Sequence, residues 1–186
     1  MREHAVDDLP AEEYRALRAT IAGRGGLRLA LSLGGLSAWA LTLVAILAWL
    51  PNPIAGSIPL VLLLATFEVN RMLHLGIERI GRFLQVFYED QAAEPAALPG
   101  WERTAMSFGP ARPGAGGHPL LLAVFIIATL VNFLAVVLPG PLPLELGAMA
   151  VPHVAFLIWI AYADRAMAHQ RARDLARFEE LKQQKR

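Results

Sequence analysis

The chain has 186 residues, of which 55% are hydrophobic and only 18% charged, with a net charge of +1 and no cysteine. This composition argues against an ordinary soluble domain, and the lack of cysteine excludes disulfides, iron–sulfur clusters and thiolate-bound haem or zinc. The apolar residues occur in long blocks with the charges between them, which is typical of a membrane protein.

The first 26 residues predict a cytoplasmic arm that contains a short amphipathic helix. Asp8 can cap this helix, Pro10 suits its first turn, and Gly23 is expected to end it. The arm is acidic, unlike the basic start of a signal peptide, so the apolar block after it is interpreted as a helix that stays in the protein. The apolar stripe of the arm could lie on the membrane surface or pack on the protein's own cytoplasmic segments.

Four segments are predicted to span a bilayer, since a helix of about 20 residues crosses the hydrocarbon core. Residues 27–50 and 119–138 are nearly free of charge and end at proline-containing turns. Residues 54–90 begin as an apolar span and become amphipathic, and residues 144–163 form a span that continues as a helical tail, 164–186. The predicted fold class is therefore an all-α integral membrane protein of two helical hairpins, with the second and fourth helices extended into the cytoplasm.

Positive charge is distributed unevenly along the chain. The turns 51–57 and 139–145 contain no Lys or Arg, whereas the N-terminal arm, the second half of the second helix, the Pro/Gly-rich loop 91–118 and the tail are basic. By the positive-inside rule, both termini and this loop are predicted to be cytoplasmic, in a bacterial-type inner membrane.

The second helix carries the strongest candidate for chemistry. Polar residues recur along it at spacings of three or four, at which side chains on a helix meet. A carboxylate at Glu68 lies deep in the predicted span, so it must face the protein interior, pair with a cation or be protonated. Two interpretations stay open: an ion path or ligand pocket, or a salt-bridged face covered by the cytoplasmic arms. The candidate residues are Glu68, Asn70, Arg71, His74, Glu78 and Arg82.

A second polar pair is expected deeper in the bilayer. His153 follows Pro152 near the middle of the fourth span, and Asn132 falls at a similar depth in the third. A contact between the two side chains would act either as a relay or ligand site or as a buried clamp between helices, worth about 0.5–2 kcal/mol.

Two further patterns concern cofactors and packing. His74 and His118 are both expected near the cytoplasmic boundary and, with Glu78, could ligate a metal or haem, but their spacing matches no established motif, so no cofactor is predicted. Small residues recur every four positions along the first span, a spacing that lets helix backbones approach closely. The partner could be another helix of the chain or the same helix of a second copy. These small residues are Gly26, Ala30, Gly34 and Ala38.

The sequence contains no recognisable catalytic motif, and the predicted outer turns are too short to hold an active site. The first hypothesis is a non-enzymatic scaffold or accessory subunit of a membrane complex, present as a homo-oligomer or with other membrane subunits and without a nucleic-acid partner. The alternative is a small homo-oligomeric ion or proton channel or transporter lined by the second helix. A second alternative is a His-ligated haem or metal redox subunit.

Overall fold

The computed structural model describes residues 9–89, 100–108 and 116–184, and every regular element among them is helical. Four of the helices are long and apolar enough to cross a membrane. In chain order the elements are α2 (Leu9–Trp49), the 3-10 helix η1 (Pro53–Gly56), α3 (Ser57–Leu84), the π-helix η2 (Gln85–Glu89), α4 (Trp101–Phe108), α5 (Pro119–Val137) and α6 (Pro143–Gln184).

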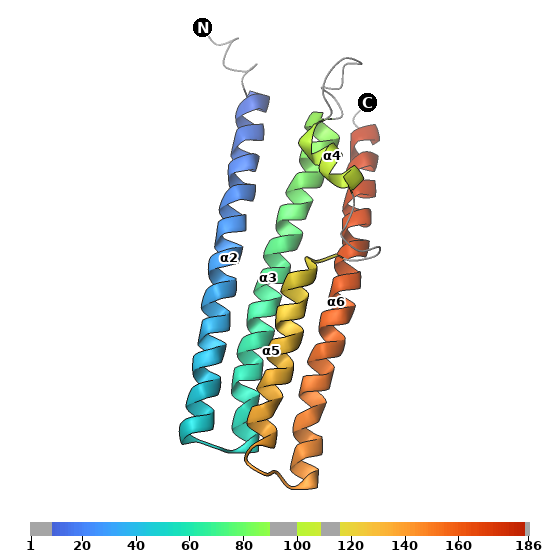
Figure 1. Cartoon of the computed structure of the whole chain (residues 1–186). Coiled ribbons are helices and arrows are strands. Elements are labelled where there is room, and N and C mark those ends of the chain that lie inside the picture. The colour runs from blue at the N-terminus through green and yellow to red at the C-terminus, as the bar shows by residue number, and fades with distance from the viewer. Residues whose placement is uncertain (1–8, 90–99, 109–115, 185–186) are drawn as a thin grey trace.

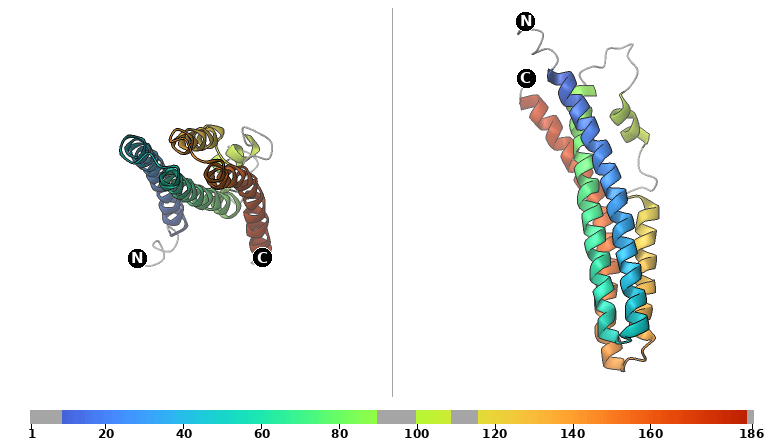
Figure 2. Two further views of the ribbon diagram at one scale, coloured as in Figure 1. Left: turned by 90° about the horizontal axis from the view of Figure 1, so that it is seen from below. Right: turned by 90° about the vertical axis from the view of Figure 1, so that its left-hand side faces the viewer.

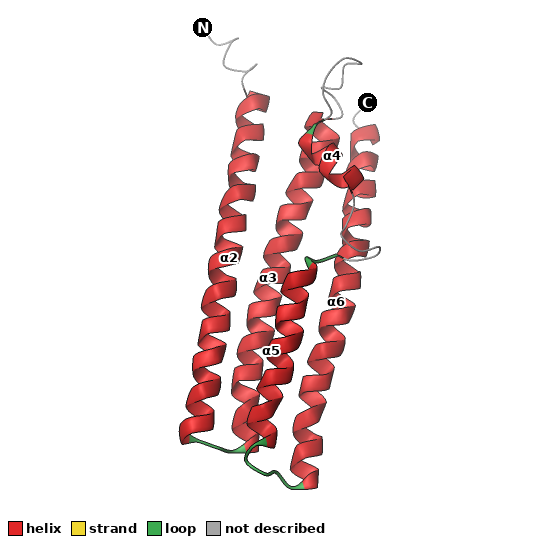
Figure 3. Ribbon diagram, viewed as in Figure 1, coloured by secondary structure: helices red, strands yellow, loops and turns green. Residues whose placement is uncertain are grey.

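The four long helices run side by side (Figure 1). The connections from α2 to α3 and from α5 to α6 lie at one end of the bundle, and the start of α2 and the end of α6 lie at the other (Figures 1 and 3). α2 packs mainly against α3, while α3, α5 and α6 pack against one another (Figure 2). α5 is much shorter than the other three, so α2, α3 and α6 continue past its start as three stalks.

The core lies where α3, α5 and α6 meet. Phe67 of α3 makes edge-to-face contacts with Phe125 of α5 and Phe156 of α6, at ring-centroid distances of 5.3 and 5.9 Å. Such pairs contribute about 0.5–1.5 kcal/mol beyond the area they bury. The outer faces of the long helices carry many exposed Leu, Ile and Val side chains, a surface of the kind that lipid covers.

The N-terminal segment differs from its sequence prediction. The prediction of a short helix that ends at Gly23 is wrong, because α2 is one continuous helix that runs through Gly23, Gly25 and Gly26. Each glycine costs about 1 kcal/mol relative to alanine in a helix interior, so local propensity favours a break here. Contacts on both sides of the glycines oppose it: Arg18 pairs with Glu102 at 2.5 Å, and Arg28 contacts His74 at 3.0 Å.

The beginning of α2 packs on the protein's own stalks, which was one of the two interpretations of the amphipathic arm. The rings of Tyr14 and Tyr88 lie 5.7 Å apart, and the Tyr88 hydroxyl donates a hydrogen bond to the Glu13 carboxylate. Residues 1–8, 90–99, 109–115 and 185–186 lie outside the described residues, and with them lie most of the predicted Pro/Gly-rich loop and the last two residues of the predicted tail.

The continuity of α2 gives a direct prediction. An added Cβ at Gly25 meets open space, so Gly25→Ala should stabilise the helix around it by about 1 kcal/mol and slow amide hydrogen exchange there. The matched control is Gly35→Ala, whose new Cβ would collide with the side chain of Thr66 and should not be stabilising. Unchanged exchange in Gly25→Ala would contradict a helix through this segment.

Candidate functional site

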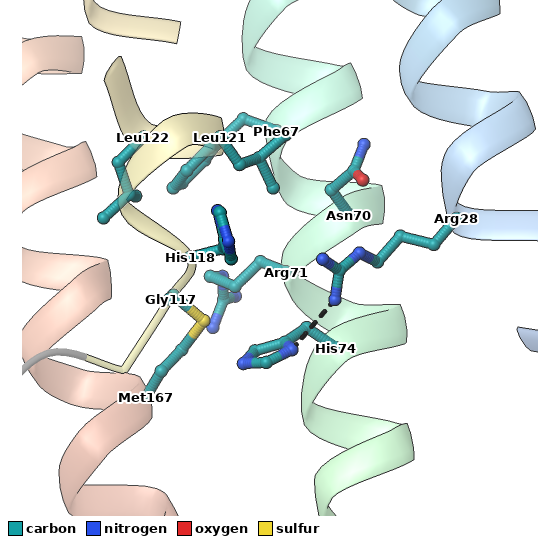
Figure 4. A pocket seen from close by; sticks show the side chains of 10 residues that line it. All are labelled: Arg28, Phe67, Asn70, Arg71, His74, Gly117, His118, Leu121, Leu122 and Met167. Carbon is teal, nitrogen blue, oxygen red and sulfur yellow. Dashed lines mark hydrogen bonds between the residues drawn. The ribbon is translucent and has the colours of Figure 1, made fainter. Parts of the chain in front are cut away.

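Polar side chains gather around the start of α5, where the apolar part of the bundle gives way to the stalks. Arg28 of α2, Arg71 and His74 of α3, and His118 just before α5 surround a cavity of about 20 Å³ (Figure 4). A cavity of this size has room for about one water molecule. The remaining lining is largely apolar and comes from Phe67, Leu121, Leu122 and Met167, with Asn70 and Gly117.

His74 has both ring nitrogens engaged. Its Nδ1 lies 3.0 Å from Arg28 Nη1, and its Nε2 lies 2.9 Å from the Gly116 carbonyl oxygen. A guanidinium group only donates and a carbonyl oxygen only accepts, so the ring accepts at Nδ1 and donates at Nε2, as a neutral imidazole. His74 therefore joins α2 to the segment before α5, and neither ring nitrogen bonds to Glu78 or Arg71.

The segment before α5, residues 116–118, packs against α6. The backbone N–H groups of Gly116 and Gly117 donate to Asp164 Oδ1 at 3.1 and 2.7 Å. A Cβ at Gly116 would overlap the backbone of α6 at Asp164, so only glycine fits there. His118 then caps α5 by accepting from the Leu120 N–H at 3.3 Å, and Pro119 occupies the first turn. These contacts fix the position of His118 beside the cavity.

Glu68 is paired with a cation, which is one of the three alternatives that its depth in the predicted span left open. Its Oε2 accepts from Arg71 Nε at 2.9 Å and from Arg71 Nη2 at 2.7 Å, and its Oε1 accepts from Trp159 Nε1 at 2.5 Å. The Arg71 guanidinium also lies 5.8 Å from the centre of the Trp159 ring. Glu68 borders an open, otherwise apolar groove of about 460 Å³ between α3 and α6, next to Pro152. The pair thus ties α3 to α6 at the edge of this groove.

Asn70 turns the other way, toward α2. Its Oδ1 accepts from Ser32 Oγ at 2.6 Å, its Nδ2 donates to the Thr66 carbonyl at 2.9 Å, and it is fully buried. This hydrogen bond joins α2 and α3 beside the cavity that Asn70 helps to line.

Farther along the stalks, Glu78 is shared by two arginines. It pairs with Arg82 of its own helix, as the spacing predicts, and its Oε2 lies 2.8 Å from Arg171 Nε of α6. Arg82 is almost completely buried. The six candidate residues of the second helix therefore have different partners. Glu68 and Arg71 face α6, and Asn70 and His74 reach α2. Glu78, which pairs with Arg82, meets Arg171 of α6.

α4 is attached to the stalks by Glu102. Its carboxylate pairs with Arg18 of α2 at 2.5 Å, and its backbone N–H donates to Glu89 Oε1 at 3.1 Å. Burial raises the pKa of Glu102, and the positive charge of Arg18 opposes part of that shift. This contact ties the central segment of the chain to the first helix.

The expected contact between Asn132 and His153 is present, and it is part of a larger clamp. Asn132 Nδ2 lies 2.9 Å from His153 Nε2 and donates to the Gly56 carbonyl at 3.0 Å, while Trp39 Nε1 donates to Asn132 Oδ1 at 3.0 Å. His153 Nδ1 lies 2.8 Å from the Met149 carbonyl, which makes Nε2 the acceptor. One buried amide therefore joins α2, η1, α5 and α6.

Sequence reasoning did not single out Trp39, Arg28 or Asp164. The position of Trp39 could have marked it, because tryptophan is enriched at membrane interfaces. A tryptophan in the middle of a span therefore needs a hydrogen-bond acceptor for its N–H. Arg28 is the one charge in the first predicted span, which also marks it. Asp164 resembles the other charges of the tail, and only its place beside residues 116 and 117 distinguishes it.

The small residues of the first span face away from the rest of the chain. Gly26, Ala30, Gly34 and Ala38 are all exposed, and a Cβ at either glycine meets nothing within 4 Å. α3 instead packs near Gly35, where Thr66 fills the space. Within the described part of the chain, the small-residue face therefore has no helix partner.

No group of three or more His, Asp or Glu side chains among the described residues is placed to hold a metal ion. His74 and His118 do line the same cavity, but both nitrogens of His74 and Nδ1 of His118 are hydrogen-bonded within the chain. Comparison with protein-family models, curated proteins and solved structures found no match. Function is therefore inferred from the geometry of this chain.

Proposed function

We propose that this chain is a non-enzymatic scaffold or accessory subunit of a membrane complex. The observation that supports this most is the use of its buried polar groups. The buried side chains of Asn70, Asn132 and His153 form hydrogen bonds that join the helices to one another. The outward faces of the apolar part of the bundle carry mainly apolar or small side chains. Such an arrangement gives a firmly held bundle whose outer surface is suited to lipid and to other membrane helices.

We further propose that the stalks lie in the cytoplasm of a bacterial-type cell. The connections 50–52 and 138–142 contain no Lys or Arg and lie at one end of the bundle, whereas the arginines of α2, α3 and α6 lie toward the stalk end (Figure 1). The positive-inside rule supports cytoplasmic stalks on this distribution. The three stalks, with α4 beside them, would then present a helical surface to a soluble or membrane partner.

The face by which the bundle associates is proposed to be that of α2. This helix packs mainly on α3, and its small-residue face points outward. Small residues at every fourth position allow a second helix to approach closely, and van der Waals contact is a main source of helix association in lipid. A second copy of the chain or another membrane subunit could occupy this face.

The test is the oligomeric state in mild detergent, together with the proteins that co-purify. Gly34→Leu would fill the small-residue face and is expected to reduce the assembled fraction measured by light scattering. Gly147→Leu is the matched control, since a Cβ there also meets open space but lies on α6. A wild-type chain that is monomeric and free of co-purifying proteins would contradict the proposal, as would identical behaviour of the two variants.

An ion path between copies is the second candidate, and the groove beside Glu68 favours it. This groove of about 460 Å³ brings a carboxylate to the outer surface of the bundle between α3 and α6. If copies meet there, Glu68→Gln should reduce ion flux from liposomes, whereas Glu145→Gln, in the first turn of α6, should leave it unchanged. Equal flux from the wild type and Glu68→Gln would count against a path at this groove.

A further inference from the structure

The cavity beside the start of α5 carries a surplus of positive charge. Among the described residues, the Arg28 side chain pairs with no carboxylate; its partner there is the neutral ring of His74. Arg71 is balanced by Glu68, and the Asp164 carboxylate accepts from the backbone N–H groups of the segment before α5. His118 adds an imidazole whose Nε2 is not needed for capping α5. Figure 4 shows these side chains converging from α2, α3 and the segment before α5. The site therefore favours a negatively charged group.

The start of α5 adds to this field. A helix of 19 residues begins at Pro119, and its positive dipole end lies next to the cavity, whose lining includes His118 and Leu121. Anions and phosphate oxygens are stabilised at such helix starts. Here the helix start is one contributor among several, since the arginine side chains supply the full charges.

The size of the cavity limits what can enter it. A volume of about 20 Å³ accepts one oxygen atom or one water molecule and excludes a whole phosphate group. The occupant must therefore insert a single oxygen and keep the rest of the molecule outside. Phe67, Leu122 and Met167 make the neighbouring wall apolar, so the occupant meets positive charge and hydrocarbon together.

The position of the cavity fits the headgroup layer of a bilayer. It lies where the apolar run of α5 begins and where the stalks leave the bundle. Basic pockets between membrane helices on the cytoplasmic side of a bundle bind anionic headgroups, and the stalk side is the proposed cytoplasmic side. A lipid phosphate at this level would have its acyl chains alongside the exposed apolar faces of the helices.

We propose that this cavity, the headgroup cavity, binds one phosphate oxygen of an anionic phospholipid from the leaflet that borders the stalks. Arg28 supplies the uncompensated charge, His118 Nε2 supplies a further donor, and the start of α5 supplies the dipole. The proposal rests on the membrane location of the four helices and not on the scaffold role. A lipid headgroup and free inorganic phosphate both present a phosphate oxyanion, so the experiment must distinguish these two sources.

The test is native mass spectrometry of the full chain in detergent, with phosphatidylglycerol, phosphatidylcholine or inorganic phosphate added at equal concentration. The wild type is expected to retain phosphatidylglycerol over both other probes. Arg28→Gln should weaken phosphatidylglycerol binding about fivefold, the loss expected for one arginine near anionic lipid. Arg15→Gln, an exposed arginine on the same helix, is the matched control and should bind as the wild type does.

His118→Asn provides a second variant that preserves folding. Asparagine can still cap α5, but it lacks the Nε2 donor, so phosphatidylglycerol binding should fall while helix content stays unchanged. Equal retention of the two lipids, or unchanged binding in both variants, would overturn the proposal. Preferential uptake of inorganic phosphate would overturn the lipid assignment. Because the number of lipid adducts is divided by the number of chains in each species, these outcomes are independent of whether the chain assembles through α2.

Discussion

Replacing Asn132 with alanine is expected to destabilise the bundle by about 2–4 kcal/mol. The substitution removes three interhelical hydrogen bonds at once, to Trp39, Gly56 and His153. It also leaves the indole N–H of Trp39 and the buried imidazole nitrogen of His153 without their partner. Each interhelical hydrogen bond in a membrane contributes on the order of 0.6–1.7 kcal/mol, and unsatisfied groups away from water add to the cost.

The free energy of unfolding can be measured by titrating the chain from a mild detergent into dodecyl sulfate. Thr42→Val is the control, because its hydroxyl bonds only to the Ala38 carbonyl of its own helix and should change stability by less than about 0.5 kcal/mol. A double-mutant cycle with His153→Ala should show non-additive effects, since the two side chains are in contact. If Asn132→Ala were as mild as Thr42→Val, the clamp would not hold the bundle together.

The contact between Asn132 and His153 could be predicted because helix geometry fixes depth. Each residue advances a helix by about 1.5 Å, so counting from the two ends places both side chains at one level. The depth of a residue does not determine which face of one helix packs against which face of another. Trp39 and Gly56 complete the same clamp, but their approach depends on how α2 and η1 are rotated and packed, and no pattern within either segment specifies it.

For the polar residues of α3, too, the sequence predicts local contacts but not the contacts between helices. Their spacing predicts a helix and the Glu78–Arg82 pair, both of which are local properties. The division of the other residues between α2 and α6 is not local, because His74 meets Arg28 and Glu68 meets Trp159 across the bundle. The failed prediction at Gly23 has the same origin, since a local preference for ending the helix is outweighed by contacts made elsewhere on α2.

Replacing Gly116 with alanine is the second substitution expected to have a large effect, of about 2–4 kcal/mol. The new Cβ would overlap the backbone of α6 at Asp164 and Ala168 and the Cβ of Met167, none of which can move without distorting the helix. The segment would have to lift away from α6. It would then lose the Asp164 bonds to its backbone and the bonds that His74 and Arg171 make to the Gly116 carbonyl.

The adjacent glycine provides the control for this prediction. A Cβ at Gly117 would lie 3.2 Å from Met167 Cε and 3.3 Å from Asp164 Oδ1, both of which are side-chain ends, so Gly117→Ala should cost less than about 1 kcal/mol. Hydrogen exchange over residues 116–122 should accelerate in Gly116→Ala and stay close to the wild type in Gly117→Ala. Because the same segment positions His118 and fixes the ring of His74, Gly116→Ala should also disturb the headgroup cavity. Equal exchange in the two variants would mean that Gly116 is not seated against α6, and the cavity would then lack the support that places His118 beside Arg28.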